Sequence, residues 1–150
     1  MEDVKLLKKV EIFKGLSSFE VAKIGKLLKG QSYAGGSQVV TMGEEGDSLF
    51  IVKNGEVAVS RTDGKGEAEI LALLGPGDHF GEIALIDSQP RSADVYAKSD
   101  SKLLQIKKGD LEKLLGRDID LAAKVYLAFA VALCKRLRDT NENLLLLRKK

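Results

Sequence analysis

Residues 80–95, FGEIALIDSQPRSADV, are the stretch from which the rest of the chain is best interpreted. An acid, Glu82, stands nine positions before an arginine, Arg91, in a segment that is otherwise apolar enough to be buried. Buried charges persist only when they are paired or hold something polar. The pattern therefore leaves two alternatives: Glu82 and Arg91 form an internal salt bridge, or together they hold a ligand.

The residues around this pair offer the groups that an anion needs. Gly81 permits a close approach of the backbone, and residues 82–85 can form one helical turn whose leading amides lack partners within the turn. Arg91 follows a loop stiffened by proline, so its planar guanidinium can be aimed at two oxygens of one phosphate, with the Ser92 hydroxyl beside it. The Glu82 carboxylate remains as an acceptor for a ligand hydroxyl. An anion with an adjacent hydroxyl describes a phosphorylated sugar.

Composition places the chain among single soluble domains. Its 150 residues are enough for one domain with a substantial core, and 31% of them are charged. The formal net charge of +2 is too small to predict a nucleic-acid groove, and the basic residues near both termini fit solvated helix faces. The longest apolar run, residues 125–134, is too short for a bilayer span of about 20 residues. No membrane contact is expected.

Histidine and cysteine are each present once, which argues against several kinds of site. A metal centre built on histidines, or a Ser-His-Asp triad, is hard to assemble when His79 is the only histidine. An enzyme on a β-roll, such as a metal-dependent cupin, is disfavoured for the same reason. Cys134 cannot form an intrachain disulfide, fits a reducing cytoplasmic compartment and lies in an apolar helical run, where a small core residue is expected.

Helical patterns occupy the N-terminal part of the chain. Apolar residues at helical spacing in residues 2–12 predict a short amphipathic helix that Gly15 breaks. Ser17 and Glu20 have the spacing of a capping box, so a second helix is expected behind them. We expect this helix to run to residues 28–29 and to stop at Gly30.

The middle of the chain, residues 31–107, reads as strands and turns. Ten of the 15 glycines fall between Gly35 and Gly81, and Asn54-Gly55 and Asp63-Gly64 are strong tight-turn signals. Many short strands at regular spacing indicate an antiparallel sandwich or β-roll, not a doubly wound sheet. The expected strands are residues 39–42, 49–53, 57–61, 69–74, 94–97 and 102–107.

The chain becomes helical again after residue 107. A short helix is expected over residues 110–115, and Asp118 can cap a long helix that continues to the chain end. One apolar stripe predicts that its first half packs on the domain itself: Leu121, Val125, Phe129, Leu133 and Leu137. A short heptad seam, interrupted by one polar residue, predicts either a homodimer helix or further packing on the same chain: Ala130, Leu133, Leu137, Thr140, Leu144 and Leu147.

The stretch FGEIALIDSQPRSADV resembles the phosphate-binding cassette of cyclic nucleotide-binding domains. That family includes protein kinase A regulatory subunits, cyclic nucleotide-gated channels and the bacterial catabolite activator protein. The resemblance extends to residues 13–16, 43–50 and 54–57, and covers roughly residues 4–147. It implies a mainly β fold with flanking helices: an antiparallel β-roll (jelly-roll) with N-terminal helices and a long C-terminal helix. Residues 1–150 would form one domain, with helices in 2–30, the roll in 31–107, the cassette in 80–95 and helices in 108–150.

The resemblance also implies roles for individual residues. Glu82 would accept a hydrogen bond from the ribose 2′-hydroxyl, and we therefore expect it to have no partner within the protein. Arg91 would bind the exocyclic oxygens of the cyclic phosphate. The final helix caps the base in this family, and a looser alignment with the catabolite activator protein assigns base contacts to Thr140 and Asn141. The phosphate shell would be completed by the amides of Gly81, Ile83 and Ala84 and by the Ser92 side chain.

The expected function is that of a sensor without catalytic activity or cofactor. Binding of the nucleotide would reposition the final helix, and Ser92 after the arginine favours cAMP over cGMP. The alternative is a ligand-free dimerisation or interaction module on the same fold. Transcription factors of this type carry a helix-turn-helix domain after the long helix, whereas this sequence ends at Lys150, so direct contact of these residues with nucleic acid is not expected.

Overall fold

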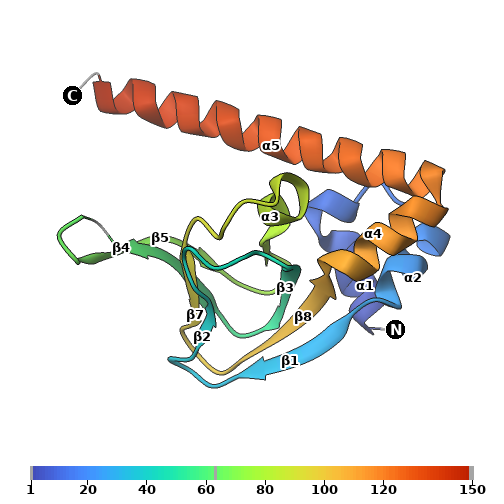
Figure 1. The fold of residues 1–150 in the computed structure, drawn as a ribbon, viewed down its shortest axis with the longest axis horizontal. Coiled ribbons are helices and arrows are strands. Elements are labelled where there is room, and N and C mark those ends of the chain that lie inside the picture. The colour runs from blue at the N-terminus through green and yellow to red at the C-terminus, as the bar shows by residue number, and fades with distance from the viewer. Residues whose placement is uncertain (1, 63, 149–150) are drawn as a thin grey trace.

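Two four-stranded antiparallel sheets form the middle of the chain, and helices precede and follow them (Figure 1). The computed structural model describes residues 2–62 and 64–148. One sheet has the order β1-β8-β3-β6, with β1 Lys29–Tyr33, β8 Ser101–Lys107, β3 Ser48–Asn54 and β6 His79–Phe80. The other has the order β2-β7-β4-β5, with β2 Gln38–Val40, β7 Asp94–Ala97, β4 Val57–Thr62 and β5 Ala68–Leu74. The expected antiparallel roll is confirmed.

The helices flank the roll as expected. Before it come α1 Glu2–Lys9, the 3-10 turn η1 Glu11–Phe13 and α2 Ser18–Gly25. The short helix α3 Glu82–Asp87 lies in the cassette, and α4 Lys108–Arg117 and α5 Ile119–Arg148 follow the last strand. No helix among the described residues is long and apolar enough to cross a membrane.

The N-terminus of α2 has the predicted capping box, but its C-terminus comes early. Ser17 Oγ accepts a hydrogen bond from the amide of Glu20, and the Ser17 amide donates to Glu20 Oε1. The helix ends at Gly25, and not at Gly30 as expected. The reason is that Lys29 already pairs with Gln105 as the first residue of β1, so the strand ladder takes over the backbone groups that a longer helix would need.

Strand β3 contributes to two separate hydrophobic clusters. Side chains alternate between the faces of a strand, so Leu49 and Ile51 pack with the helices while Phe50 and Val52 point between the two sheets. Between the sheets, the rings of Phe50 and Phe80 stack with centroids 5.1 Å apart and planes 14° apart. This stack anchors β6, which is two residues long, immediately before the cassette.

The two halves of α5 have different surroundings. Leu121, Val125 and Phe129 are buried, which confirms that the first half packs on the domain. Figure 1 shows α5 beginning beside α4 and the N-terminal helices and then extending away from them. Along the second half, Leu137 and Leu147 are 61% and 67% exposed, so the predicted seam is uncovered there within the described part of the chain, whereas Leu133 at its start is half-buried.

The start of α5 is fixed by side chains of α2 and by its own cap. Asp118 Oδ1 accepts from the Leu121 amide at 3.1 Å, which confirms the predicted cap. The other carboxylate oxygen of Asp118 lies 2.6 Å from Lys23 Nζ, and Lys124 Nζ lies 2.9 Å from Glu20 Oε1. These two ion pairs tie α2 to the first turns of α5.

Cys134 is exposed, so its assignment to the core is wrong. It follows Phe129 by five residues, and a rotation of about 100° per residue turns it away from the buried stripe. Gly55 has φ +90°, as the Asn54-Gly55 turn signal predicts, whereas Asp63 of the second turn signal lies outside the described residues.

Candidate functional site

A cavity of about 510 Å³ lies at the cassette, within the size range of small-molecule sites. One wall is apolar and comes from the second sheet, including Val59 and Leu74. Glu82 and Arg91 of the cassette also line the cavity, and so does Arg136 of α5. A ligand here would have an apolar flank and a strongly polar end.

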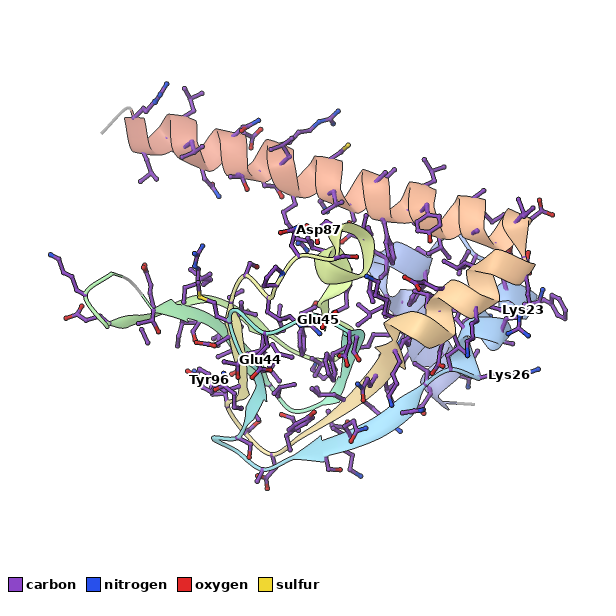
Figure 2. All side chains as sticks on the ribbon, viewed as in Figure 1. Lys23, Lys26, Glu44, Glu45, Asp87 and Tyr96 are labelled. Carbon is purple, nitrogen blue, oxygen red and sulfur yellow. The ribbon has the colours of Figure 1, made fainter. Side chains whose placement is uncertain are left out.

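The backbone on both sides of Arg91 is fixed by the segment that leads into β3. The Arg91 amide donates to the carbonyl of Glu44 at 2.7 Å, and the Gly43 amide donates to the carbonyl of Arg91 at 2.9 Å. Glu45 pairs with Pro90 in an isolated antiparallel bridge. Figure 2 labels the exposed residues Glu44 and Glu45 on this segment. The cassette loop is thus tied down where its arginine begins.

The guanidinium of Arg91 is buried and held from one side. The residue is 8% exposed, and its Nη2 donates to the main-chain carbonyl of Ser48 at 2.8 Å. No other acceptor within hydrogen-bonding range of this guanidinium belongs to residues 2–62 or 64–148. Burial lowers the pKa of Arg91, while the negative charges of Asp47, Glu82 and Glu44 raise it. The remaining N–H donors can therefore serve an anion.

Only glycine fits at position 81. Gly81 has φ +93°, and a Cβ built there would lie 2.5 Å from Arg91 Nη1 and 2.6 Å from the Ser48 carbonyl oxygen. Both contacts are shorter than real Cβ atoms tolerate. The glycine thus allows the arginine to lie directly against the backbone at the start of α3.

Glu82 has two partners within the protein, so the expectation that it is unpaired is wrong. Its Oε1 accepts a hydrogen bond from Nη2 of Arg136 at 2.6 Å, and its Oε2 lies 3.3 Å from His79 Nδ1. A carboxylate that is only 4% exposed needs such partners, because a bare buried charge is costly. The predicted alternative of a Glu82–Arg91 salt bridge is also not what forms, since Glu82 pairs with Arg136 and lies in contact with His79.

The pKa of Glu82 reflects this surrounding. Burial alone would raise it, but the hydrogen bond and charge of His79 and the charge of Arg136 outweigh burial and lower the pKa to about 2. Glu82 is therefore ionised near neutral pH. A carboxylate offers about four lone-pair positions, so one that already accepts two hydrogen bonds can still accept a further one.

Comparison with known proteins decides the family. Residues 30–118 match the family described as "Cyclic nucleotide-binding domain". The chain belongs to the cyclic nucleotide-binding domain family. The resemblance and fold inferred from the sequence are both confirmed. The solved catabolite activator protein of Thermus thermophilus superposes with a TM-score of 0.82 at 34% identity, covering 91% of this chain and 62% of that one.

Curated relatives of this cyclic nucleotide-binding domain include two kinds of kinase component. The cAMP-dependent protein kinase regulatory subunit of Yarrowia lipolytica is 40% identical over 76% of the chain, which spans 30% of that protein. A cGMP-dependent protein kinase of Caenorhabditis briggsae is 33% identical over 82% of the chain, which spans 17% of it. The chain thus spans less than a third of the length of either relative.

Within this cyclic nucleotide-binding domain, the structure brings some of the expected site residues together and leaves others apart. Gly81, Glu82, Ile83, Arg91 and Ser92 all line the cavity. Ala84 lies in α3, but its side chain is outside the described set. Thr140 and Asn141 are exposed and do not line the cavity.

Sequence reasoning missed two residues, His79 and Arg136. A signal for Arg136 existed, because it precedes the singled-out Thr140 by four positions and so lies on the same helix face. Thr140 Oγ1 donates to the main-chain carbonyl of Arg136 at 2.9 Å. For His79, the signal was its position three residues before Glu82.

Proposed function

We propose that this cyclic nucleotide-binding domain is a regulatory sensor that binds cAMP in the cassette cavity and has no catalytic activity of its own. The observation that carries the proposal is the buried Arg91 guanidinium, which lines the cavity and has one main-chain acceptor. A guanidinium with further donors is suited to a phosphate, because its planar fork can make two parallel hydrogen bonds.

The ligand pose follows from this arginine. The cyclic phosphate would lie against Arg91, with the amides of Gly81, Ile83 and Ala84 and the Ser92 hydroxyl completing its shell. The ribose 2′-hydroxyl would donate to Glu82, whose remaining lone pairs permit a third hydrogen bond. The apolar wall of the second sheet would then face the sugar and base.

The final helix would respond to the ligand through Glu82. Arg136 of α5 already donates to this carboxylate. A ligand hydroxyl that also donates to Glu82 would therefore share the carboxylate with Arg136 and could alter the contact of α5 with the cassette. Base contacts from Thr140 and Asn141 would require the second half of α5 to come closer to the cavity. Such a contact, made in only one position of the helix, is what lets a ligand shift the helix equilibrium.

The choice of cAMP over cGMP rests on Ser92, the residue after the cassette arginine. Curated relatives include both a cAMP-dependent regulatory subunit and a cGMP-dependent kinase, so the family alone leaves the nucleotide open. The proposal includes a homodimer through the seam of α5 and a cytoplasmic location that suits the lone cysteine. It includes no contact of these residues with nucleic acid.

Titration calorimetry of the purified chain with cAMP, cGMP and 5′-AMP tests the proposal. We expect saturable binding of cAMP, weaker binding of cGMP, and little binding of 5′-AMP, which has the same base without the cyclic phosphate. Absence of heat from both cyclic nucleotides at high micromolar concentration would contradict it.

A second candidate function is a ligand-free dimerisation module. The internal partners of Glu82 favour it, because a site that is already satisfied needs no ligand to be stable. This alternative predicts a dimer in sedimentation experiments whose association constant does not change when either cyclic nucleotide is added.

A further inference from the structure

A series of hydrogen-bonded polar side chains crosses the first sheet from β1 to the start of β3, with the two glutamines half-buried, Ser48 buried and Asp47 exposed. Gln31 Nε2 of β1 donates to Gln105 Oε1 of β8 at 3.0 Å. Gln105 Nε2 donates in turn to Ser48 Oγ of β3 at 2.6 Å, and Ser48 Oγ donates to Asp47 Oδ1 at 3.1 Å. The three hydrogen bonds run in one direction and end on a carboxylate.

Ser48 is the residue through which this series reaches the site. It is fully buried, and among the described residues its main-chain carbonyl is the acceptor that the Arg91 side chain uses. Its hydroxyl meanwhile accepts from Gln105 and donates to Asp47. Asp47 is also the carboxylate whose charge acts most strongly on Arg91. Ser48 therefore links the hydrogen-bond acceptor of the guanidinium, its own carbonyl, to the nearby charge of Asp47, with which its hydroxyl is hydrogen-bonded.

The location of these polar residues is unusual for the face they occupy. Gln105 pairs with Phe50, and both point between the sheets, where the neighbouring side chains form an apolar cluster. Gln105 is half-buried, and the buried part of its amide costs free energy unless its hydrogen bonds are made, whereas an apolar residue would carry no such cost. The polar choice thus calls for a role beyond filling space.

We propose that Gln105 is a positioning residue for phosphate recognition: through Ser48 and Asp47 it fixes the direction in which the Arg91 guanidinium points. Gln31 holds Gln105 in the rotamer that this requires. The part of this proposal that concerns ligand binding rests on the proposed cyclic nucleotide function. The hydrogen bonds that link Gln31, Gln105, Ser48 and Asp47 do not depend on it.

The decisive variant is Gln105→Met, which keeps the length of the side chain and removes both hydrogen bonds. Its matched control is Leu103→Met, which alters the same strand and the same face in the apolar cluster and, although Leu103 lies opposite Gln31, removes no hydrogen-bonding group. A second route is Ser48→Ala, which removes the hydroxyl but keeps the carbonyl. If the hydrogen-bonded side chains act as a unit, the double variant Gln105→Met, Ser48→Ala should lose no more affinity for cAMP than either single variant.

The readout is the affinity for cAMP and for its two phosphorothioate diastereomers, in which sulfur replaces one or the other exocyclic oxygen. A fixed guanidinium distinguishes the two, and a loosened one does not. We expect Gln105→Met to weaken cAMP binding by about 3- to 10-fold, which is the effect of losing one hydrogen bond between Arg91 and the phosphate. The two diastereomers should also become closer in affinity. Leu103→Met should lower the melting temperature and leave the ratio unchanged. An unchanged ratio in Gln105→Met overturns the inference and leaves the proposed function intact.

A ligand-free measurement keeps the two proposals separable. The guanidinium N–H protons of Arg91, assigned with Arg91→Ala, should exchange slowly with water in the unaltered protein because the group is buried and hydrogen-bonded. In Gln105→Met we expect faster exchange, and in Leu103→Met no change. If the unaltered chain binds neither cyclic nucleotide, the proposed function fails and this exchange rate alone decides the inference: faster exchange supports it and equal exchange overturns it.

Discussion

Arg136 Nη2 donates to Glu82 Oε1 at 2.6 Å, joining α5 to the cassette across 54 positions of sequence. The two ends of this contact differ, because the arginine side chain is 53% exposed and that of the glutamate 5%. The carboxylate is the buried and fixed partner, and the arginine is the one that can leave. Under the proposed function, this contact is the route by which a ligand bound to Glu82 would act on α5.

Replacement of Arg136 by alanine should weaken this contact without unfolding the domain. Since Arg136 is half exposed, we expect the free energy of unfolding to fall by only about 1 kcal/mol. A double-mutant cycle with Glu82→Gln, measured by urea unfolding, should give a coupling of similar size. Arg138→Ala, which removes an exposed arginine two positions away, is the control. Additive effects of the two substitutions would show that the contact contributes nothing to stability.

Replacement of Arg91 by alanine should abolish phosphate recognition. Loss of the partner of a buried phosphate is expected to reduce the affinity for cAMP by about 2–5 kcal/mol. Arg91→Lys should recover only part of this, because an ammonium keeps the charge but lacks the planar fork. Calorimetry measures both, and Arg61→Ala on the exposed part of β4 is the control. A dissociation constant that is unchanged in Arg91→Ala would assign this arginine a purely structural role.

Acid should destabilise the protein through Glu82. Its pKa is about 2 in the folded chain, against an ordinary value of 4.5. Because the folded value is the lower one, the stabilisation is fully present above pH 4.5 and is lost as the pH falls toward 2. Since a difference of one in pKa corresponds to about 1.4 kcal/mol, Glu82 should contribute roughly 3 kcal/mol to the free energy of unfolding above pH 4.5.

The variant Glu82→Gln isolates that contribution. Its free energy of unfolding should depend less on pH than that of the unaltered protein between pH 5 and 2, while Glu112→Gln on the exposed side of α4 should not differ. Denaturant unfolding at a series of pH values measures the difference. Parallel curves for Glu82→Gln and the unaltered chain would exclude Glu82 as the source.

Charge placed on the seam of α5 should prevent dimerisation. Leu137 and Leu144 are 61% and 56% exposed and lie on the predicted heptad positions. We expect the unaltered chain to dimerise and Leu137→Glu with Leu144→Glu to be monomeric, because charges at these positions would be buried against each other. Val131→Glu, which is exposed but off the seam, is the control in sedimentation velocity. If the unaltered chain is monomeric at high micromolar concentration, the dimer proposal fails.

The fold was largely predictable from local sequence signals. The β7 strand Asp94–Ala97 has the expected bounds, and the capping box at Ser17 and the cap at Asp118 form as predicted. The strand β1, Lys29–Tyr33, was missed because its sequence KGQSY has no apolar alternation. Its extended form comes from pairing with β8, which is far away in the sequence, and such pairing cannot be recognised from the residues of β1 alone.

The site was predictable in its cassette and not beyond it. Spacing placed Glu82 and Arg91 at one cavity, but it could not reveal that Arg136 occupies the carboxylate, since that contact depends on how α5 lies over the roll. The same limit applies to Thr140 and Asn141. Thr140 and Asn141 do not line the cavity because of where α5 lies, and the sequence pattern of a helix does not give its position in the fold.

The alternation of β3 side chains ties the folding of the two parts of the molecule together. One strand supplies Leu49 and Ile51 to the helical cluster and Phe50 and Val52 to the cluster between the sheets. Neither cluster can come apart without exposing residues that flank the other on the same backbone. Helices and roll should accordingly melt as one cooperative unit, with a single heat-absorption peak and equal calorimetric and van't Hoff enthalpies.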